Sequence, residues 1–212
     1  MNTRFIPILL LLVFFVSCSD SEKERTYKAK LKAIKLYNDA NNEQQKGNWN
    51  KALELYNESI LLDSTNASSF NNRGFTKVVL GDTNSGLNDY LKSIQLDDSL
   101  SNAYNNIGLI YARRKNFDDA LINYNKAISL DPEYAVALNN RGMIHSHQSN
   151  HQEAIADFSK AIKLNAADGR LYTNRAISYY LIKDTSNACL DITKANDLED
   201  TTAKKYLNLF CK

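Results

Sequence analysis

Proline and glycine are scarce in this sequence, with two prolines and seven glycines among 212 residues. One of the prolines, Pro7, stands close to the N-terminus, so the rest of the chain has almost no helix-breaking residue. So few turn-forming residues argue against long irregular loops and indicate helices that are joined by short, uniform turns.

An excess of charge of one sign is also absent, because 26 basic side chains stand against 24 acidic ones. The composition therefore gives no electrostatic reason to expect a nucleic acid or an anionic membrane as partner. Apolar residues make up 43% of the chain and charged residues 24%, which is enough for a packed core with a solvated surface.

Motifs of catalysis and cofactor binding are missing as well. The chain has no G-x-G-x-x-G, no phosphate-binding loop, no G-x-S-x-G and no H-E-x-x-H. His145, His147 and His151 are its histidines, and residues two apart on a helix point to different faces, so we expect no metal site. We predict that the protein is not an enzyme and uses no cofactor and no small-molecule substrate.

No hydrophobic run is long enough to cross a membrane as a helix. The longest, residues 5–16, falls short of the roughly 20 residues that a bilayer requires. With Arg4 before it and Ser17 after it, this run makes residues 1–17 a predicted secretory signal peptide. The stretch F-V-S-C that ends at Cys18 resembles the lipobox of bacterial lipoproteins, which implies lipidation of Cys18 and a membrane anchor there. The alternative is an ordinary cleaved leader in which Cys18 has no special role.

Residues 18–26 are polar and charged and are interpreted as a solvated tether. Ser19, next to the cysteine, is similar to the residue found in lipoproteins that are sorted to the outer membrane. The sequence thus predicts an outer-membrane lipoprotein of the cell envelope, on either the periplasmic or the surface face.

The main pattern of the chain is a repeat of 34 residues. It is clearest in residues 101–134, where it comprises Tyr104, Ile107, Gly108, Tyr111, Ala120, Tyr124 and Pro132. This spacing resembles the tetratricopeptide repeat. Shifts of 34 residues give position eight of each repeat as Ala40, Gly74, Gly108, Gly142 and Ala176, position twenty as Ala52, Gly86, Ala120, Ala154 and Ala188, and position twenty-four as Tyr56, Tyr90, Tyr124, Phe158 and Ile192.

The resemblance implies an all-α fold, a right-handed superhelix of five helix-turn-helix repeats with a C-terminal capping helix. The expected domain is 27–212, with repeats at 33–66, 67–100, 101–134, 135–168 and 169–202 and the cap at 203–212. Small residues at positions eight and twenty let the paired helices approach, and the large side chain at position twenty-four fills the space between them. The Asn or Asp in the middle of each intra-repeat turn is expected to tolerate the turn geometry and to cap the second helix.

Arginine at position seven occurs only together with aspartate at position twenty-three. The pairs are Arg73 with Asp89, Arg141 with Asp157 and Arg175 with Asp191, whereas repeat three has Ile107 with Asn123. We expect an ion pair between the two helices of each of these three repeats, partly exposed and worth only about 0–1 kcal/mol.

Asparagine fills position six throughout, and in the tetratricopeptide fold this position faces the concave groove. The series is Asn38, Asn72, Asn106, Asn140 and Asn174, with Asn208 in the cap, and position five adds Asn71, Asn105 and Asn139. An uncharged amide both donates and accepts hydrogen bonds, so such a ladder suits an extended peptide backbone. The alternative is that asparagine is common at this position in the family whether or not it contacts a ligand.

Position nine is also expected to face the groove, and it carries Phe75, Leu109, Met143 and Ile177. A row of exposed apolar side chains would mark a contact patch, and packing on neighbouring helices is the alternative. With the amides, this row predicts an extended partner whose apolar side chains alternate with backbone contacts. Modest positive charge in the groove is expected from Arg113, His147 and Arg170.

Cys189 and Cys211 are predicted to form a disulfide between repeat five and the cap, because Cys189 is expected to face the following helix and an exported protein meets oxidising conditions. Two buried free thiols are the alternative. Taken together, the sequence predicts a scaffold or adaptor that binds another protein or peptide segment. The second hypothesis is a structural subunit that oligomerises through the groove or the cap.

Overall fold

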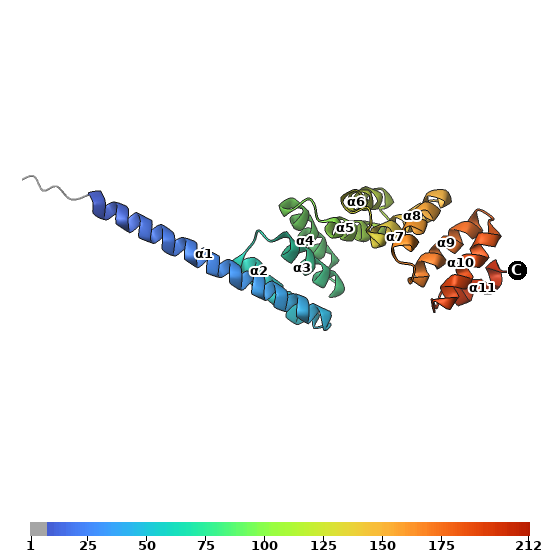
Figure 1. The fold of residues 1–212 in the computed structure, drawn as a ribbon, viewed down its shortest axis with the longest axis horizontal. Helices are drawn as coiled ribbons and strands as arrows, with labels where there is room; N and C mark the ends of the chain where they lie inside the picture. The colour runs from blue at the N-terminus through green and yellow to red at the C-terminus, as the bar shows by residue number, and fades with distance from the viewer. Residues whose placement is uncertain (1–7) are drawn as a thin grey trace, which may run out of the picture. The chain divides into compact units, whose positions relative to one another are not determined.

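A computed structural model describes residues 8–212, with side chains from residue 22 onward, and this part of the chain contains helices and no strand. Residues 1–7 of the predicted signal peptide, the side chains of its other residues and the side chain of Cys18 lie outside the described residues. The predicted all-α class is confirmed (Figure 1). The helices are α1 (Ile8–Gln45), α2 (Trp49–Leu62), α3 (Ala67–Val79), α4 (Thr83–Leu96), α5 (Ser101–Arg113), α6 (Phe117–Leu130), α7 (Ala135–His147), α8 (His151–Leu164), α9 (Gly169–Leu181), α10 (Thr185–Asp197) and α11 (Ala203–Phe210).

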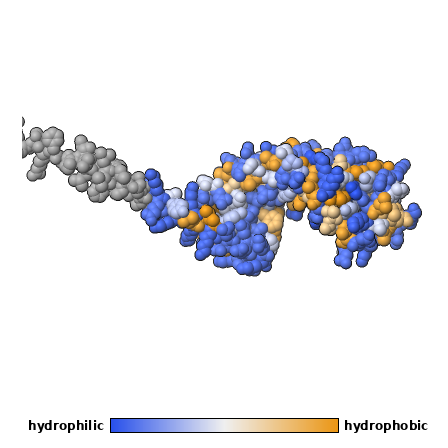
Figure 2. Space-filling view, in the orientation of Figure 1, coloured by the Kyte–Doolittle hydropathy of each residue, from blue (hydrophilic) through white to orange (hydrophobic). Residues whose placement is uncertain are grey.

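The chain divides into two compact units, residues 1–96 and residues 97–212. In the N-terminal unit α1 pairs with α2 and α3 with α4. In the C-terminal unit α5 pairs with α6, α7 with α8 and α9 with α10, and α11 packs on α10. Polar and apolar side chains are interspersed on the surface of this second unit (Figure 2).

Close approach of the paired helices depends on the small residues that the sequence places at positions eight and twenty. In repeat one Ala40 and Ala52 are fully buried around Tyr56. In repeat four a Cβ added to Gly142 would lie 2.8 Å from Cε1 of Phe158, closer than van der Waals contact allows. The ring of Phe158, itself buried, therefore occupies the volume that a side chain at Gly142 would need.

Substitutions at Gly142 should show how tight this packing is. We expect Gly142→Val to lower the free energy of unfolding by about 2 kcal/mol, because the added isopropyl group forces the ring of Phe158 out of place. Gly142→Ala should cost clearly less, since repeat one already combines Ala40 with the buried ring of Tyr56. Hydrogen exchange of the α7 and α8 amides is the measurement, and equal losses for the two variants would contradict this packing.

The sequence predicted that the central Asn or Asp of each intra-repeat turn adopts the unusual backbone conformation, and the structure places that conformation at another residue. The first residue of each turn, and not the central Asn or Asp, has a positive φ; these residues are Gly47, Gly81, Lys115, Ser149 and Lys183. Glycine adopts this conformation without strain. The central residue caps the second helix at Asp82, Asn116 and Asp184, but Asn48 and Asn150 accept no capping hydrogen bond.

The predicted tether is helical in the structure. Helix α1 runs without interruption from Ile8 to Gln45, and its N-terminal part extends beyond α2 (Figure 1). An exposed ion pair of 2.7 Å between Lys28 and Glu24, one turn apart, supports this extension. The segment lacks glycine and proline, so the helix that packs from Ala33 onward continues backwards through it. Among the described residues no helix combines the length and hydrophobicity needed to cross a membrane.

The three predicted ion pairs between paired helices are confirmed. In repeat four Nε of Arg141 donates to Asp157 at 2.8 Å and Nη2 donates to its second carboxylate oxygen at 2.6 Å. The pairs are more buried than expected, because the side chains of Arg141 and Asp157 are only 21% and 6% exposed. Nη1 of Arg141 also donates to Asn125 of the preceding repeat at 2.7 Å, so the guanidinium joins three helices. The two other pairs, Arg73 with Asp89 and Arg175 with Asp191, have the same two-pronged geometry.

The C-terminal cap is held by an apolar contact and a covalent bond. Phe210 of α11 is buried, and its ring stacks on Tyr180 with 4.4 Å between the ring centroids. A disulfide joins Cys211, just after α11, to Cys189 of α10. The cap is therefore fixed to the last repeat both by packing and by a covalent link.

Candidate functional site

Hydrogen bonds between side-chain amides connect successive repeats of the C-terminal unit. Nδ2 of Asn140 on α7 donates to Oδ1 of Asn105 on α5 at 2.9 Å. In the same way Nδ2 of Asn174 on α9 donates to Oδ1 of Asn139 on α7 at 3.0 Å. Position six of one repeat thus bonds to position five of the repeat before it, and the amide ladder is part of the stacking between repeats.

Two asparagines of the predicted binding set are buried. Asn71 and Asn105 are each only 4% exposed, so they do not line an open surface as the sequence predicted. In the N-terminal unit Nδ2 of Asn72 donates to Oδ1 of Asn41 at 2.9 Å and to the hydroxyl of Tyr37 at 3.2 Å. The expectation that position five faces an open groove is therefore wrong for Asn71 and Asn105, whereas Asn72 is only partly buried.

Three partly buried amides of the C-terminal unit, Asn139, Asn140 and Asn174, line a hollow of about 380 Å³ between α7 and α9. Its wall combines predicted and unpredicted side chains. The predicted ones are Asn139, Asn140, Met143, Arg170, Asn174 and Ile177, and the others are Thr173, Asp200 and Thr202. One N–H of Asn174 is used on Asn139, and the rest of the hydrogen-bonding capacity of this amide is available to a ligand.

Apolar side chains continue this surface along α7 and α9. Met143 is 49% exposed and Ile177 half-buried, and both also border a smaller adjoining hollow with His147 and Phe158. The ring of His147 lies 4.5 Å from that of Phe117, measured between centroids. The surface between α7 and α9 therefore offers apolar contacts beside its amides.

Position nine behaves differently in the other repeats. Leu109 of α5 is half-buried. In the N-terminal unit Phe75 is 38% exposed and its ring packs against that of Trp49, with 6.1 Å between the ring centroids. Neither residue borders the hollow between α7 and α9.

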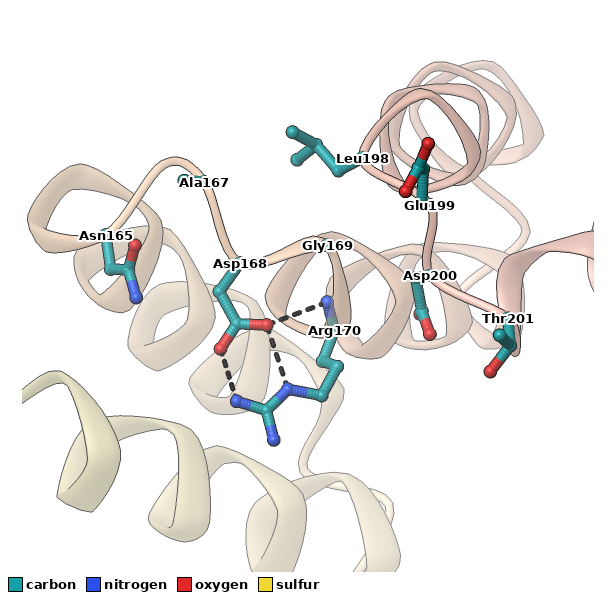
Figure 3. A pocket seen from close by; sticks show the side chains of 9 residues that line it. All are labelled: Asn165, Ala167, Asp168, Gly169, Arg170, Leu198, Glu199, Asp200 and Thr201. Carbon is teal, nitrogen blue, oxygen red and sulfur yellow. Dashed lines mark hydrogen bonds and ion pairs between the residues drawn. The ribbon is translucent and has the colours of Figure 1, made fainter. Parts of the chain in front are cut away.

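The hollow between α7 and α9 adjoins a second hollow, which is lined by the turns before α9 and α11 (Figure 3). An ion pair between Arg170 and Asp168 lies where the two hollows meet. The guanidinium of Arg170 makes two hydrogen bonds of 2.9 and 2.7 Å to the carboxylate of Asp168. These bonds lower the pKa of the Asp168 carboxyl, and the same contact raises the pKa of Arg170. Asp200, which also borders both hollows, accepts a hydrogen bond from the hydroxyl of Thr173. The Arg170–Asp168 pair neutralises itself, so this edge is polar and gains little positive charge from Arg170.

Thr173 and Asp200 were not predicted from the sequence, although the residue type at position five could have indicated Thr173. Position five is asparagine in repeats two, three and four, and Thr173 breaks that series in repeat five. There its hydroxyl bonds to Asp200 in the turn before α11, so the last repeat uses a different polar contact towards the cap.

Several predicted residues lie away from this hollow. Asn38 on α1 and Asn208 on α11 are exposed, in the first repeat and in the cap. Asn106 is partly buried on α5. His145 and His151 are partly buried and do not converge with His147, and the described residues contain no cluster of metal-ligating side chains.

Removing one amide of the ladder should test how much the ladder contributes to the stability of the fold. We expect Asn140→Ala to lower the free energy of unfolding of the C-terminal unit by about 1–2 kcal/mol, because it leaves the buried Oδ1 of Asn105 without its donor. Thermal melting followed by circular dichroism is the measurement. Asn208→Ala, on the exposed face of α11, is the control and should melt like the unaltered chain. Identical melting of the two variants would show that the hydrogen bond between the side chains of Asn140 and Asn105 adds nothing to stability.

The comparisons with known proteins agree with this geometry. Residues 101–134 and 135–167 match the sequence profile of the family described as Tetratricopeptide repeat. These two segments are tetratricopeptide repeats. The matched segments coincide with the pairs α5–α6 and α7–α8, and the tetratricopeptide pairing of helices recurs in α9–α10 of the same unit. No match was found among curated proteins.

Several solved structures resemble most of the chain in fold. A crystal structure of MamA has 22% sequence identity and a TM-score of 0.66, over 82% of this chain and 94% of that one. YrrB, described as a TPR protein with an unusual peptide-binding site, has 19% identity and a TM-score of 0.66, over 88% and 96%. The pilF protein of Pseudomonas aeruginosa has 18% identity and a TM-score of 0.71, over 81% and 77%. Identities this low show the fold alone.

Proposed function

We propose that this protein is a scaffold of the cell envelope that binds an extended segment of another protein along α7 and α9. The observation that carries the proposal is the hollow between these helices, where amides, apolar side chains and a polar edge meet. Amide side chains hold the backbone of an extended peptide without the cost of desolvating a charge. Met143 and Ile177 supply the apolar contact for alternate side chains of the same segment.

The place of action in the proposal is the membrane surface. The F-V-S-C stretch supports lipidation of Cys18, and the long α1 would then separate the repeats from the anchor. Among the solved neighbours, YrrB is described as having a peptide-binding site, which supports a peptide as the class of ligand. The disulfide between Cys189 and Cys211 fits an oxidising compartment outside the cytoplasm.

Site-specific photocrosslinking in native envelopes tests the binding surface. A benzophenone side chain at Met143 should form an adduct with a second polypeptide, because Met143 borders the hollow and is half exposed. The matched control is the same group at Ile122, which is 64% exposed on α6 and outside the hollow. Equal adducts at both positions would contradict a specific surface between α7 and α9.

The second candidate, a structural subunit that oligomerises, predicts a different adduct. In that case Met143 would crosslink to another copy of the same chain, and the unlipidated protein would sediment as a stable dimer. A monomer in sedimentation together with a heterologous adduct at Met143 supports the scaffold.

A further inference from the structure

The described part of α1, from Glu22 to the start of repeat one, carries an apolar stripe that no other element covers. Tyr27, Leu31 and Ile34 follow each other at helical spacing and are 63%, 49% and 49% exposed. From Glu22 to Lys32 every side chain is exposed except that of Ala29, which is half-buried. Exposure of such a stripe to water is unfavourable, and exposed apolar patches commonly mark sites of interaction. The charged residues beside the stripe indicate what kind of surface it contacts.

Lysines border the stripe on both sides. Lys23 and Lys30, four residues before and three after Tyr27, lie along one edge, and Lys28 and Lys35 lie along the other. Such side chains place their alkyl stems along apolar surface and their ammonium groups in the polar layer beside it. The arrangement is that of a helix that lies in the plane of a membrane interface.

The local charge differs from that of the whole chain. Residues 22–35 contain six basic side chains and two acidic ones, although the chain as a whole is nearly balanced. Glu24 and Lys28 neutralise each other in an ion pair, which leaves five basic side chains and one acidic one, Glu22. The total charge, which gave no reason to expect an anionic membrane, conceals this local excess.

We infer that this segment of α1, residues 22–35, binds the headgroup layer of anionic phospholipids and lies on the membrane surface. Charge complementarity selects an anionic bilayer as the occupant, and the position of the segment in the chain agrees with it. Tyr27 follows Cys18 by nine residues, about 14 Å along a helix, so an anchor at Cys18 would bring the stripe to the lipid surface. The anchor and the basic segment would then attach the chain to the bilayer at two neighbouring points.

Vesicle cosedimentation of the unacylated chain, residues 19–212, tests this inference. This chain keeps the packing of the repeats, because the first buried side chain among the described residues is that of Ala33. It should bind vesicles of phosphatidylglycerol and phosphatidylcholine in equal parts, but not vesicles of phosphatidylcholine alone. Lys23→Gln with Lys30→Gln should lower the partition coefficient roughly 25-fold, at about fivefold for each lysine.

The matched control is Lys160→Gln with Lys163→Gln, two exposed lysines of α8. This variant changes the total charge by the same amount and should bind like the unaltered chain, and circular dichroism should show equal helicity for both variants. Failure to bind the anionic vesicles, or an equal loss in the control, would overturn the inference. So would sedimentation of the chain as a dimer that depends on Tyr27 and Leu31 and has no affinity for vesicles. Because the hollow between α7 and α9 takes no part, these outcomes are independent of the crosslinking result.

Discussion

Asp157→Ala should lower the free energy of unfolding of the C-terminal unit by about 3 kcal/mol, because it leaves the guanidinium of Arg141 buried without its partner. Both side chains of the pair are largely removed from water, and the carboxylate accepts two hydrogen bonds from Arg141. A partly exposed pair would contribute only about 0–1 kcal/mol, so the size of the loss distinguishes the buried pair of the structure from the partly exposed pair that the sequence predicted. Hydrogen exchange of the α7 and α8 amides measures the loss in this unit.

Repeat three supplies the control for this prediction. It carries Ile107 and Asn123 at the same two positions, and Nδ2 of Asn123 donates to the backbone oxygen of Asp119 at 2.8 Å. The double variant Arg141→Ile with Asp157→Asn copies this arrangement into repeat four, where the backbone oxygen of Glu153 occupies the equivalent place. We expect the double variant to lose clearly less stability than Asp157→Ala, since no charge is left unpaired. A double variant that is as unstable as the single one would contradict the ion pair as the cause.

Replacing Cys189 and Cys211 by serine should destabilise the cap by about 3 kcal/mol, the loop-closure effect expected for their separation of 22 residues. Without the disulfide, α11 is held by packing, in which the ring of Phe210 stacks on Tyr180 of α9. An eight-residue helix has little stability of its own, so its amides should lose most of their protection from hydrogen exchange. Dithiothreitol should produce the same loss in the unaltered chain and no further loss in the serine variant.

The cap also bears on the proposed binding surface. Asp200 and Thr202, in the turn before α11, form part of the hollow, and Thr173 of α9 bonds to Asp200. We therefore expect the serine variant to form fewer adducts through a benzophenone at Met143. Unchanged protection of α11 in the serine variant would show that the stacked rings hold the cap without the disulfide.

Much of the fold could be predicted from the sequence because its determinants lie close together in the chain. Gly142 and Phe158 belong to one repeat, and their size alone decides whether two helices can pack. The same holds for Arg141 and Asp157, whose joint presence or absence in each repeat predicts their contact. The turns were predicted less well, because the residue with positive φ is often an ordinary one such as Lys115 or Ser149.

The sequence by itself determined that this chain forms helix pairs with a repeat of 34 residues and that asparagines recur at one position of the pairs. Only the tertiary structure decided what those asparagines contact. Asn140 and Asn105 are 35 residues apart, and their bond depends on how one repeat stacks on the next, so Asn105 is buried while Asn174 borders a hollow. The physical reason is that side-chain size acts within a pair, whereas the burial of a polar group depends on every neighbour that excludes water from it.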